Sequence, residues 1–118
     1  MYGVPANIDL TFLNGAELVQ IALGRYQIQF HFHSGASVTV DGDWNLTDAS
    51  GIVVDRSYHT TARPPYRLHQ LIGQTVVGTV VSAPTSVSLQ FADGEVLQLI
   101  DSSESYESFQ IQPGNIIV

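Results

Sequence analysis

The stretch Ile28–Val40, IQFHFHSGASVTV, decides the fold, because apolar and polar side chains alternate on both sides of a short turn. Alternation with a period of two residues is typical of a half-buried β-strand. The turn His33-Ser34-Gly35 suits a three-residue hairpin loop in which glycine takes the left-handed position. It would pair Phe30 with Val38 and Ile28 with Val40, so one face of this hairpin is apolar throughout.

A further strand precedes this hairpin, in LVQIAL from Leu18 to Leu23. We place Val19, Ile21 and Leu23 on one face of it. Gly24-Arg25 is predicted to form a two-residue turn, which pairs Leu23 with Tyr26 and Ile21 with Ile28. The result is a three-stranded meander. Its polar face carries Gln27, Gln29, His31, Ser37, Thr39 and Asp41.

The second half of the chain repeats this pattern. VSLQFADGEVLQL, from Val87, matches the opening stretch at a separation of 59 positions, and LIGQTVVGTVV, from Leu71, matches LNGAELVQIAL, from Leu13, at a separation of 58. The difference of one residue falls in the first hairpin loop, where insertions are well tolerated. In the second half this loop contains Pro84, whose fixed φ excludes a left-handed turn position, so we expect a wider loop there. The chain therefore contains an internal repeat.

We predict an all-β fold in which two three-stranded antiparallel meanders form a small sandwich or flattened barrel with pseudo-twofold symmetry. A single meander cannot bury its apolar face, whereas two can bury theirs against each other. At most one short helical turn is expected, with Leu68, Leu71 and Ile72 inward. The 118 residues should form one domain, 1–118, with repeat one at about 13–46, a connector at about 47–67 and repeat two at about 68–118.

The charge balance limits the function. Four arginines, no lysines and 11 acidic residues give a formal net charge of −7. Phosphate neutralisation needs a basic surface, so we expect no nucleic-acid partner and no membrane partner. Cysteine is absent, which excludes disulfides and thiolate chemistry. Because no apolar run could span a membrane and the chain does not start like a signal peptide, we expect a cytoplasmic protein.

His31 and His33 form an H-x-H pair that could bind a metal from one face of a strand. A metal-dependent enzyme is therefore a second alternative function. The pair lacks further ligands at facing positions, His33 falls in the turn, and the second repeat has Gln90 and Ala92 instead, so we predict a polar strand face and no cofactor. Asp41 and Asp43, in VDGDW, do not complete a calcium-loop pattern, and we read them as solvent-facing acids beside a bulge.

The segment DSSESYES, from Asp101 to Ser108, is our candidate binding surface, because exposed tyrosine among acidic residues is common at protein interfaces. Alternatively, this segment is a polar loop that leads into the last strand. The residues of this candidate site are Asp101, Glu104, Tyr106, Glu107 and Ser108.

A second candidate site lies in and beside the Pro64-Pro65 loop, which carries three of the four cations. Arginine with tyrosine could hold a carboxylate or phosphate, which defines a small anionic-ligand site as the alternative function. Local pairing of the arginines with the excess of acids is the other reading. The residues of this site are Arg56, Tyr58, His59, Arg63, Tyr66 and Arg67.

The pattern L-x-G-x-x-V, F-x-D-G-x-x-L and Y-E-S resembles a family of small uncharacterised bacterial proteins of unknown function. It is carried by Leu71, Gly73, Val76, Phe91, Asp93, Gly94, Leu97, Asp101 and Tyr106-Glu107-Ser108, over the last half of the chain. This resemblance brings no established activity with it. Some small acidic bacterial proteins of similar appearance are immunity proteins that neutralise toxins, and this comparison is an analogy only.

The sequence thus favours a non-enzymatic, acidic binding module that engages a protein partner, either immunity-like or adaptor-like. Edge strands in a small duplicated sheet need covering, so a homo-oligomer is also expected.

Overall fold

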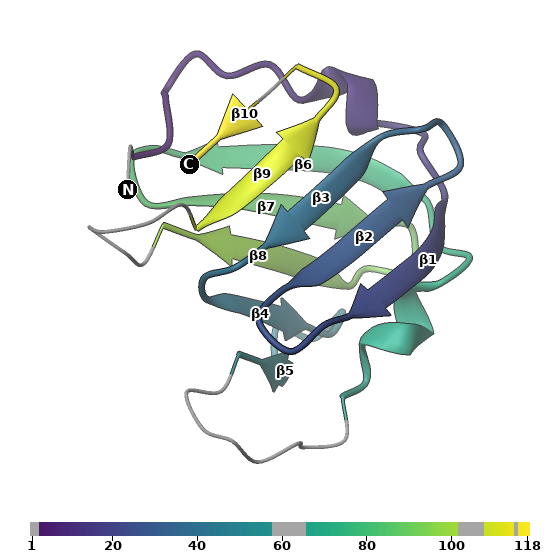
Figure 1. Ribbon diagram of the computed structural model, residues 1–118. Helices are drawn as coiled ribbons and strands as arrows, with labels where there is room; N and C mark the ends of the chain where they lie inside the picture. The colour runs from purple at the N-terminus through teal and green to yellow at the C-terminus, as the bar shows by residue number, and fades with distance from the viewer. Residues whose placement is uncertain (1–2, 58–65, 102–107, 115) are drawn as a thin grey trace.

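The computed structural model describes residues 3–57, 66–101, 108–114 and 116–118 and shows two five-stranded antiparallel sheets packed face to face (Figure 1). Sheet one has the order β1-β2-β3-β9-β10, namely β1 (Leu18–Leu23), β2 (Ile28–Phe32), β3 (Ser37–Val40), β9 (Phe109–Gln112) and β10 (Ile116–Ile117). Sheet two has the order β5-β4-β8-β7-β6, namely β5 (Val53–Arg56), β4 (Trp44–Thr47), β8 (Val96–Ile100), β7 (Ser86–Phe91) and β6 (Val76–Ser82). The predicted all-β sandwich is confirmed.

Two short 3-10 helices, η1 (Thr11–Leu13) and η2 (Leu68–Leu71), each lead into the first strand of a repeat. The sequence predicted only the second of these turns. Leu68 and Leu71 are buried as expected, whereas Ile72 is 47% exposed, because it follows the turn in an extended conformation.

The hairpins that close each meander have the predicted register. Phe30 pairs with Val38 in sheet one, and Leu89 pairs with Leu97 in sheet two. Gly35 and Gly94 take φ values of 92° and 91°, in the left-handed region where a side chain is disfavoured. The turn chemistry read from the sequence therefore fixed this part of the fold.

The predicted turn of the first hairpin is wrong by one position. Leu23 pairs with Ile28, and the amide of Gly24 donates to the carbonyl of Gln27 at 2.8 Å, so Arg25 and Tyr26 are the loop residues. The Arg25 guanidinium lies 5.2 Å from the centre of the Tyr26 ring, a cation–π contact made within the turn.

A β-bulge at Val19 corrects the alternation predicted for β1. The bulge places Leu18 opposite Phe32, so Leu18 is fully buried and Val19 is exposed. A bulge adds one unpaired residue to a strand, which a simple period of two cannot anticipate. β6 has the same irregularity between Val76 and Gly78, at the equivalent position of the second repeat.

The loop that contains Pro84 is wider than its counterpart, as expected. Ser82 pairs with Ser86, which leaves three residues between them, compared with the two residues between Gly24 and Gln27. The extra residue of the second repeat therefore lies in this loop.

The two repeats meet around a pseudo-twofold axis. The amide of Gly15 donates to Val76 and the amide of Gly73 donates to Leu18, both at 2.7 Å. Gly15 corresponds to Gly73, and Leu18 to Val76, so each of these hydrogen bonds is the symmetry counterpart of the other. Each bond joins the turn before the first strand of one repeat to the start of the first strand of the other repeat.

The hairpin that follows each meander joins the sheet of the other meander; β5 of the first of these hairpins comes from the predicted connector. β4 and β5 follow the first meander along the chain but pair with β8 in sheet two, and β9 and β10 follow the second meander but pair with β3 in sheet one (Figure 1). Leu46 pairs with Leu97 in sheet two. At the equivalent position of sheet one, Ile111 pairs with Val38. The sandwich is therefore built from two interlocked halves.

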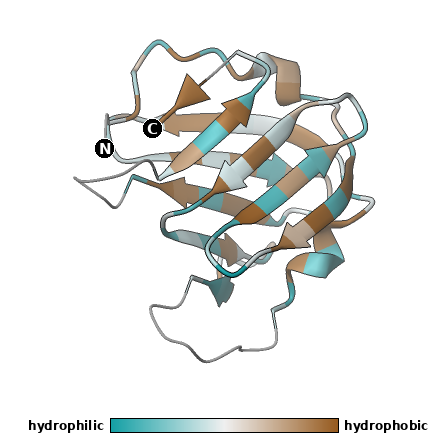
Figure 2. Ribbon diagram, viewed as in Figure 1, coloured by the Kyte–Doolittle hydropathy of each residue, from teal (hydrophilic) through white to brown (hydrophobic). Residues whose placement is uncertain are grey.

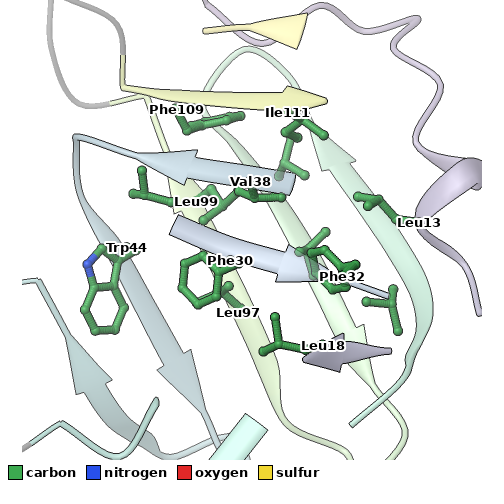
Figure 3. Packing of buried hydrophobic residues seen from close by; sticks show 14 of the residues in the cluster. Leu13, Leu18, Phe30, Phe32, Val38, Trp44, Leu97, Leu99, Phe109 and Ile111 are labelled. Atoms are coloured by element: carbon green, nitrogen blue, oxygen red, sulfur yellow. The ribbon is translucent and has the colours of Figure 1, made fainter. Parts of the chain in front are cut away.

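The core lies between the inner faces of the two sheets (Figure 3). Phe30, Val38 and Ile111 from sheet one are each fully buried, as are Leu97 and Leu99 from sheet two. Figure 2 shows the result as alternating apolar and polar bands along β2 and β9. Polar residues of these strands consequently face outward.

Candidate functional site

A chain of hydrogen-bonded polar side chains runs along the outer face of β2. The Nε2–H group of His31 donates to Oε1 of Gln29 at 3.1 Å, Nε2 of Gln29 donates to Oε1 of Gln27 at 2.6 Å, and Nε2 of Gln27 donates to Asp41 at 3.3 Å. His31, Gln29 and Gln27 are half-buried. The predicted polar face therefore exists, and its amides are held in place by one another.

The H-x-H pair does not form a metal site with other described residues. His31 is bonded to Gln29, while His33 lies in the exposed turn, where its backbone amide donates to the carbonyl of Glu17. Within the described parts of the chain, no three histidine or acidic side chains are grouped so that they could hold a metal ion.

The two connections that cross between the sheets touch each other at one end of the sandwich. The connection from β3 to β4 donates the amides of Asp41 and Gly42 to the carbonyl of Ser108, at 2.9 and 2.8 Å. The amide of Ile100, the last residue of β8, donates to the carbonyl of Asp43 at 3.0 Å. We call this the crossover end. It brings the acids of VDGDW beside the two ends of the Asp101–Ser108 segment, which are far away in sequence.

The two described residues of the predicted binding segment serve to anchor it. The Ser108 hydroxyl is buried and donates to Oδ1 of Asp101 at 3.1 Å, and Oδ2 of Asp101 accepts the amide of Gly3 at 2.9 Å. Glu104, Tyr106 and Glu107 lie outside the described residues. Gly42 belongs to a crossover between sheets, where the sequence suggested a bulge within one.

A hollow of about 570 Å³ lies on the outer side of sheet two, and Arg56 of the second predicted site lines it. Asp43, Asn45 and Ser57 add polar groups to its wall. The Ser57 hydroxyl donates to Asp43 at 3.1 Å and accepts the amide of Trp44 at 3.2 Å, so this wall is fixed by its own hydrogen bonds.

The other described residues of the second predicted site, Tyr66 and Arg67, do not line this hollow. Tyr66 packs edge-on against Trp44, with ring centres 5.4 Å apart, and the amide of Arg67 donates to the buried carboxylate of Asp55. Tyr58, His59 and Arg63 lie outside the described residues. Asp55 was missed by sequence reasoning, because its strand position resembles that of any other edge residue.

Three acids gather at the end of sheet two opposite the crossover end. Burial, a hydrogen bond with Asp93 and the negative charges of Asp93 and Asp48 together raise the pKa of the Glu95 carboxyl to about 7, against the opposing positive charge of Arg67. The Asp48 carboxylate accepts the amides of Ser50 and Ile52 at 2.8 and 3.0 Å, which identifies it as a turn-forming residue.

An apolar hollow of about 510 Å³ lies between the segment around η1 and the β9–β10 turn. Ile8, Phe12, Pro113 and Ile116 contribute its apolar lining, and Asp9 lies at its margin. The Asp9 carboxylate accepts both the amide and the hydroxyl of Thr11, so it orders η1.

The fold defines the class to which the chain belongs: a β-sandwich made of two interlocked β-meander repeats. No protein-family model, curated protein or solved structure matches the chain. None of the helices in the described residues is long and apolar enough to cross a membrane.

Proposed function

We propose that the protein is a non-enzymatic binding module whose acidic crossover end engages a basic protein surface. The observation that carries this proposal is the pair of hydrogen bonds from Asp41 and Gly42 to Ser108, which unite the two crossovers. They place the acids of one repeat beside the Asp101–Ser108 segment of the other. An immunity-like or adaptor-like role agrees with such a surface.

The charge distribution supports this assignment. Within the described strands of both sheets, Asp55 and Arg56 of β5 are the only acidic or basic residues apart from His31, so the formal net charge of −7 resides mainly in the turns and connections. Asp41 is exposed and Asp43 is half-buried at the crossover end. The acids at the crossover end would accelerate encounter with a basic partner and make binding sensitive to salt.

The test is affinity capture from cell extract with two variants of matched charge. Asp41→Asn/Glu104→Gln/Glu107→Gln removes three acids at the crossover end and its segment, whereas Asp9→Asn/Asp48→Asn/Asp93→Asn removes three acids elsewhere. We expect a basic partner that binds the wild type and the second variant, is lost from the first, and is released by moderate salt. A partner that both variants retain equally, or that is indifferent to salt, would contradict the proposal.

A second candidate function is the binding of a small anion in the hollow beside Arg56. The side chains of Arg56 and Asn45 carry hydrogen-bond donors at the wall of this space of about 570 Å³. Thermal denaturation with phosphate and with simple carboxylates tests this function. Stabilisation by either ligand should disappear in Arg56→Gln, and an absence of stabilisation in the wild type would reject it.

A further inference from the structure

The two 3-10 turns share one backbone framework but present different surfaces. Leu10 and Leu13 of the η1 segment are buried, as are their counterparts Leu68 and Leu71, which lie 58 positions later. The amide that follows each turn donates to the carbonyl three residues before it, at 3.0 Å after η1 and 3.1 Å after η2. The apolar hollow beside η1 can therefore be compared with the second repeat position by position.

The side chains that make this hollow apolar have polar counterparts in the second repeat. Phe12 lines the hollow and is 36% exposed, and the residue 58 positions later is Gln70. The register of the edge strands makes Asp55 the counterpart of Ile116, which also lines the hollow. The shared fold therefore does not require apolar side chains here, and a partly exposed phenylalanine in an apolar hollow is typical of a ligand-binding surface.

The charge at the margin of the hollow is also reversed between the repeats, since Asp9 corresponds to Arg67. Oδ1 of Asp9 accepts the amide of Thr11 at 3.0 Å and its hydroxyl at 2.7 Å, whereas Oδ2 accepts no hydrogen bond from the described part of the chain. The bonds from Thr11 lower the pKa of Asp9, so this exposed carboxylate stays charged at neutral pH. Neither arginine nor histidine is among the described residues that line the hollow.

We propose that this hollow binds a small primary amine whose apolar body lies against Phe12 and Ile116 and whose ammonium group donates to Oδ2 of Asp9. The apolar wall favours a hydrocarbon body, and the carboxylate favours a cationic head group over a neutral or anionic one. A metal ion is a poor match, because the wall offers a single acidic side chain. The volume of about 510 Å³ lies in the range of small-molecule pockets.

The amine site is separate from the acidic crossover end. Ser108 directly precedes β9, whereas Pro113 and Gly114 of the hollow directly follow this strand. Figure 1 shows the β9–β10 turn beside η1, at the end of β9 that points away from the crossover. The hollow therefore shares no residue with the surface proposed for the protein partner.

The test is an NMR titration of the full chain with probes that share one apolar body. Octylammonium, octan-1-ol and octanoate differ in the charge of the head group, and butylammonium has the same head group on a shorter body. The amide signals of Phe12 and Gly114 report on the hollow itself. Measurements at an ionic strength of about 0.1 M limit the contribution of distant charges.

Three variants accompany the wild type in this titration. Asp9→Asn removes the charge and retains an acceptor oxygen for Thr11. Asp48→Asn is the matched control, because Asp48 is also a turn-forming carboxylate but lies outside the hollow. Phe12→Gln introduces the residue that the second repeat has at this position. Circular dichroism and thermal unfolding verify that each variant is folded, and the probe series on the wild type carries the same test if Phe12→Gln does not fold.

We expect octylammonium to shift the reporter signals saturably, with a dissociation constant of about 1 mM or tighter. Octan-1-ol should bind more weakly and octanoate most weakly, and butylammonium should bind at least about tenfold more weakly than octylammonium. Asp9→Asn should weaken octylammonium binding about threefold to fivefold, as for an exposed ion pair, and leave octan-1-ol unchanged. Asp48→Asn should change the octylammonium constant less than about twofold. Phe12→Gln should weaken octylammonium and octan-1-ol alike, at least about fivefold.

Several results would overturn the proposal. One is the absence of a saturable shift at Phe12 and Gly114 with octylammonium up to about 10 mM. Equal affinity for the three eight-carbon probes, or equal weakening by Asp9→Asn and Asp48→Asn, would show that the carboxylate does not select the ligand. Reporter signals that shift on dilution of the protein alone would identify a second copy of the chain as the occupant instead.

Discussion

At the scale of single residues, two equivalent glycines differ in their surroundings. Gly35 and Gly94 have φ values of 92° and 91°, but an added Cβ would meet nothing at Gly35 and would lie 2.8 Å from the Ala49 Cβ at Gly94. We expect Gly35→Ala to lower the free energy of unfolding by about 1 kcal/mol through backbone strain alone. Gly94→Ala should lower it further because it adds a steric clash. Urea denaturation of both variants measures the difference, and equal losses would contradict this explanation.

Glu95 should make stability depend on pH. Its folded pKa, about 7, lies above the unfolded value of 4.5, so the folded state binds more protons between these values. The contribution is fully present below pH 4.5 and is lost as the pH rises through 7. Because Glu95 is partly solvated, we expect an effect of about 1 kcal/mol or less.

Glu95→Gln tests this dependence. The variant should be more stable than the wild type at pH 8 and should show a flatter stability profile from pH 4.5 to 7. Denaturant unfolding across this range is the measurement. If the two profiles run parallel, Glu95 is not the responsible group.

At the scale of secondary-structure elements, Asp55 ties an edge strand to η2. It ends a row across sheet two formed by Leu89, Leu97 and Leu46, and the equivalent row of sheet one ends in Ile116. The buried Asp55 carboxylate accepts the amide of Arg67, which directly precedes η2. This carboxylate is thus the polar exception in an apolar row.

Removal of that acceptor should be costly. Asp55→Ala leaves the Arg67 amide without this acceptor, and we expect a loss of about 2 kcal/mol in unfolding free energy. Asp55→Asn retains an acceptor oxygen and should lose clearly less. Thermal and urea unfolding compare the two variants. If Asp55→Asn lost as much unfolding free energy as Asp55→Ala, the charge of Asp55 and not its hydrogen bond would be the source of the stabilisation.

Elements were predictable where local chemistry defines them. Phe30, Phe32 and Gly35 fixed the β2–β3 hairpin, because strand alternation and a left-handed glycine are both visible in sequence. The β1 register was not predictable, since the bulge at Val19 follows Leu18, whose backbone is hydrogen-bonded to Gly73 and Gln74 of the other repeat. For the candidate sites, the polar face of β2 was foreseen. The proximity of Asp41 to Ser108 was not, because it depends on long-range packing.

At the scale of the whole molecule, the exchanged hairpins make the two halves mutually dependent. Each sheet combines the three strands of one meander with the two-stranded hairpin that follows the other meander. We expect a chain cut by a specific protease at a site introduced between residues 58 and 65 to remain one particle. Each sheet would otherwise lose an inner strand and the core contacts made by it.

Size-exclusion chromatography and unfolding experiments examine this expectation, with the uncut chain as the control. The cut protein should elute with the uncut one, and its unfolding temperature should increase with protein concentration because unfolding then separates two chains. Separation of the fragments in the absence of denaturant would show that the interlocking adds little.

The sequence by itself determined the β class, the duplication and the turns of the closing hairpins. Alternation of apolar residues and the conformational freedom of glycine act within a few residues of the chain, so they can be read locally. The tertiary structure alone decided which hairpin joins which sheet, where the strands bulge, and that Ser108 lies against Asp41 and Gly42. These features arise from burying the apolar faces of two incomplete halves at once, and that requirement is a property of the whole chain.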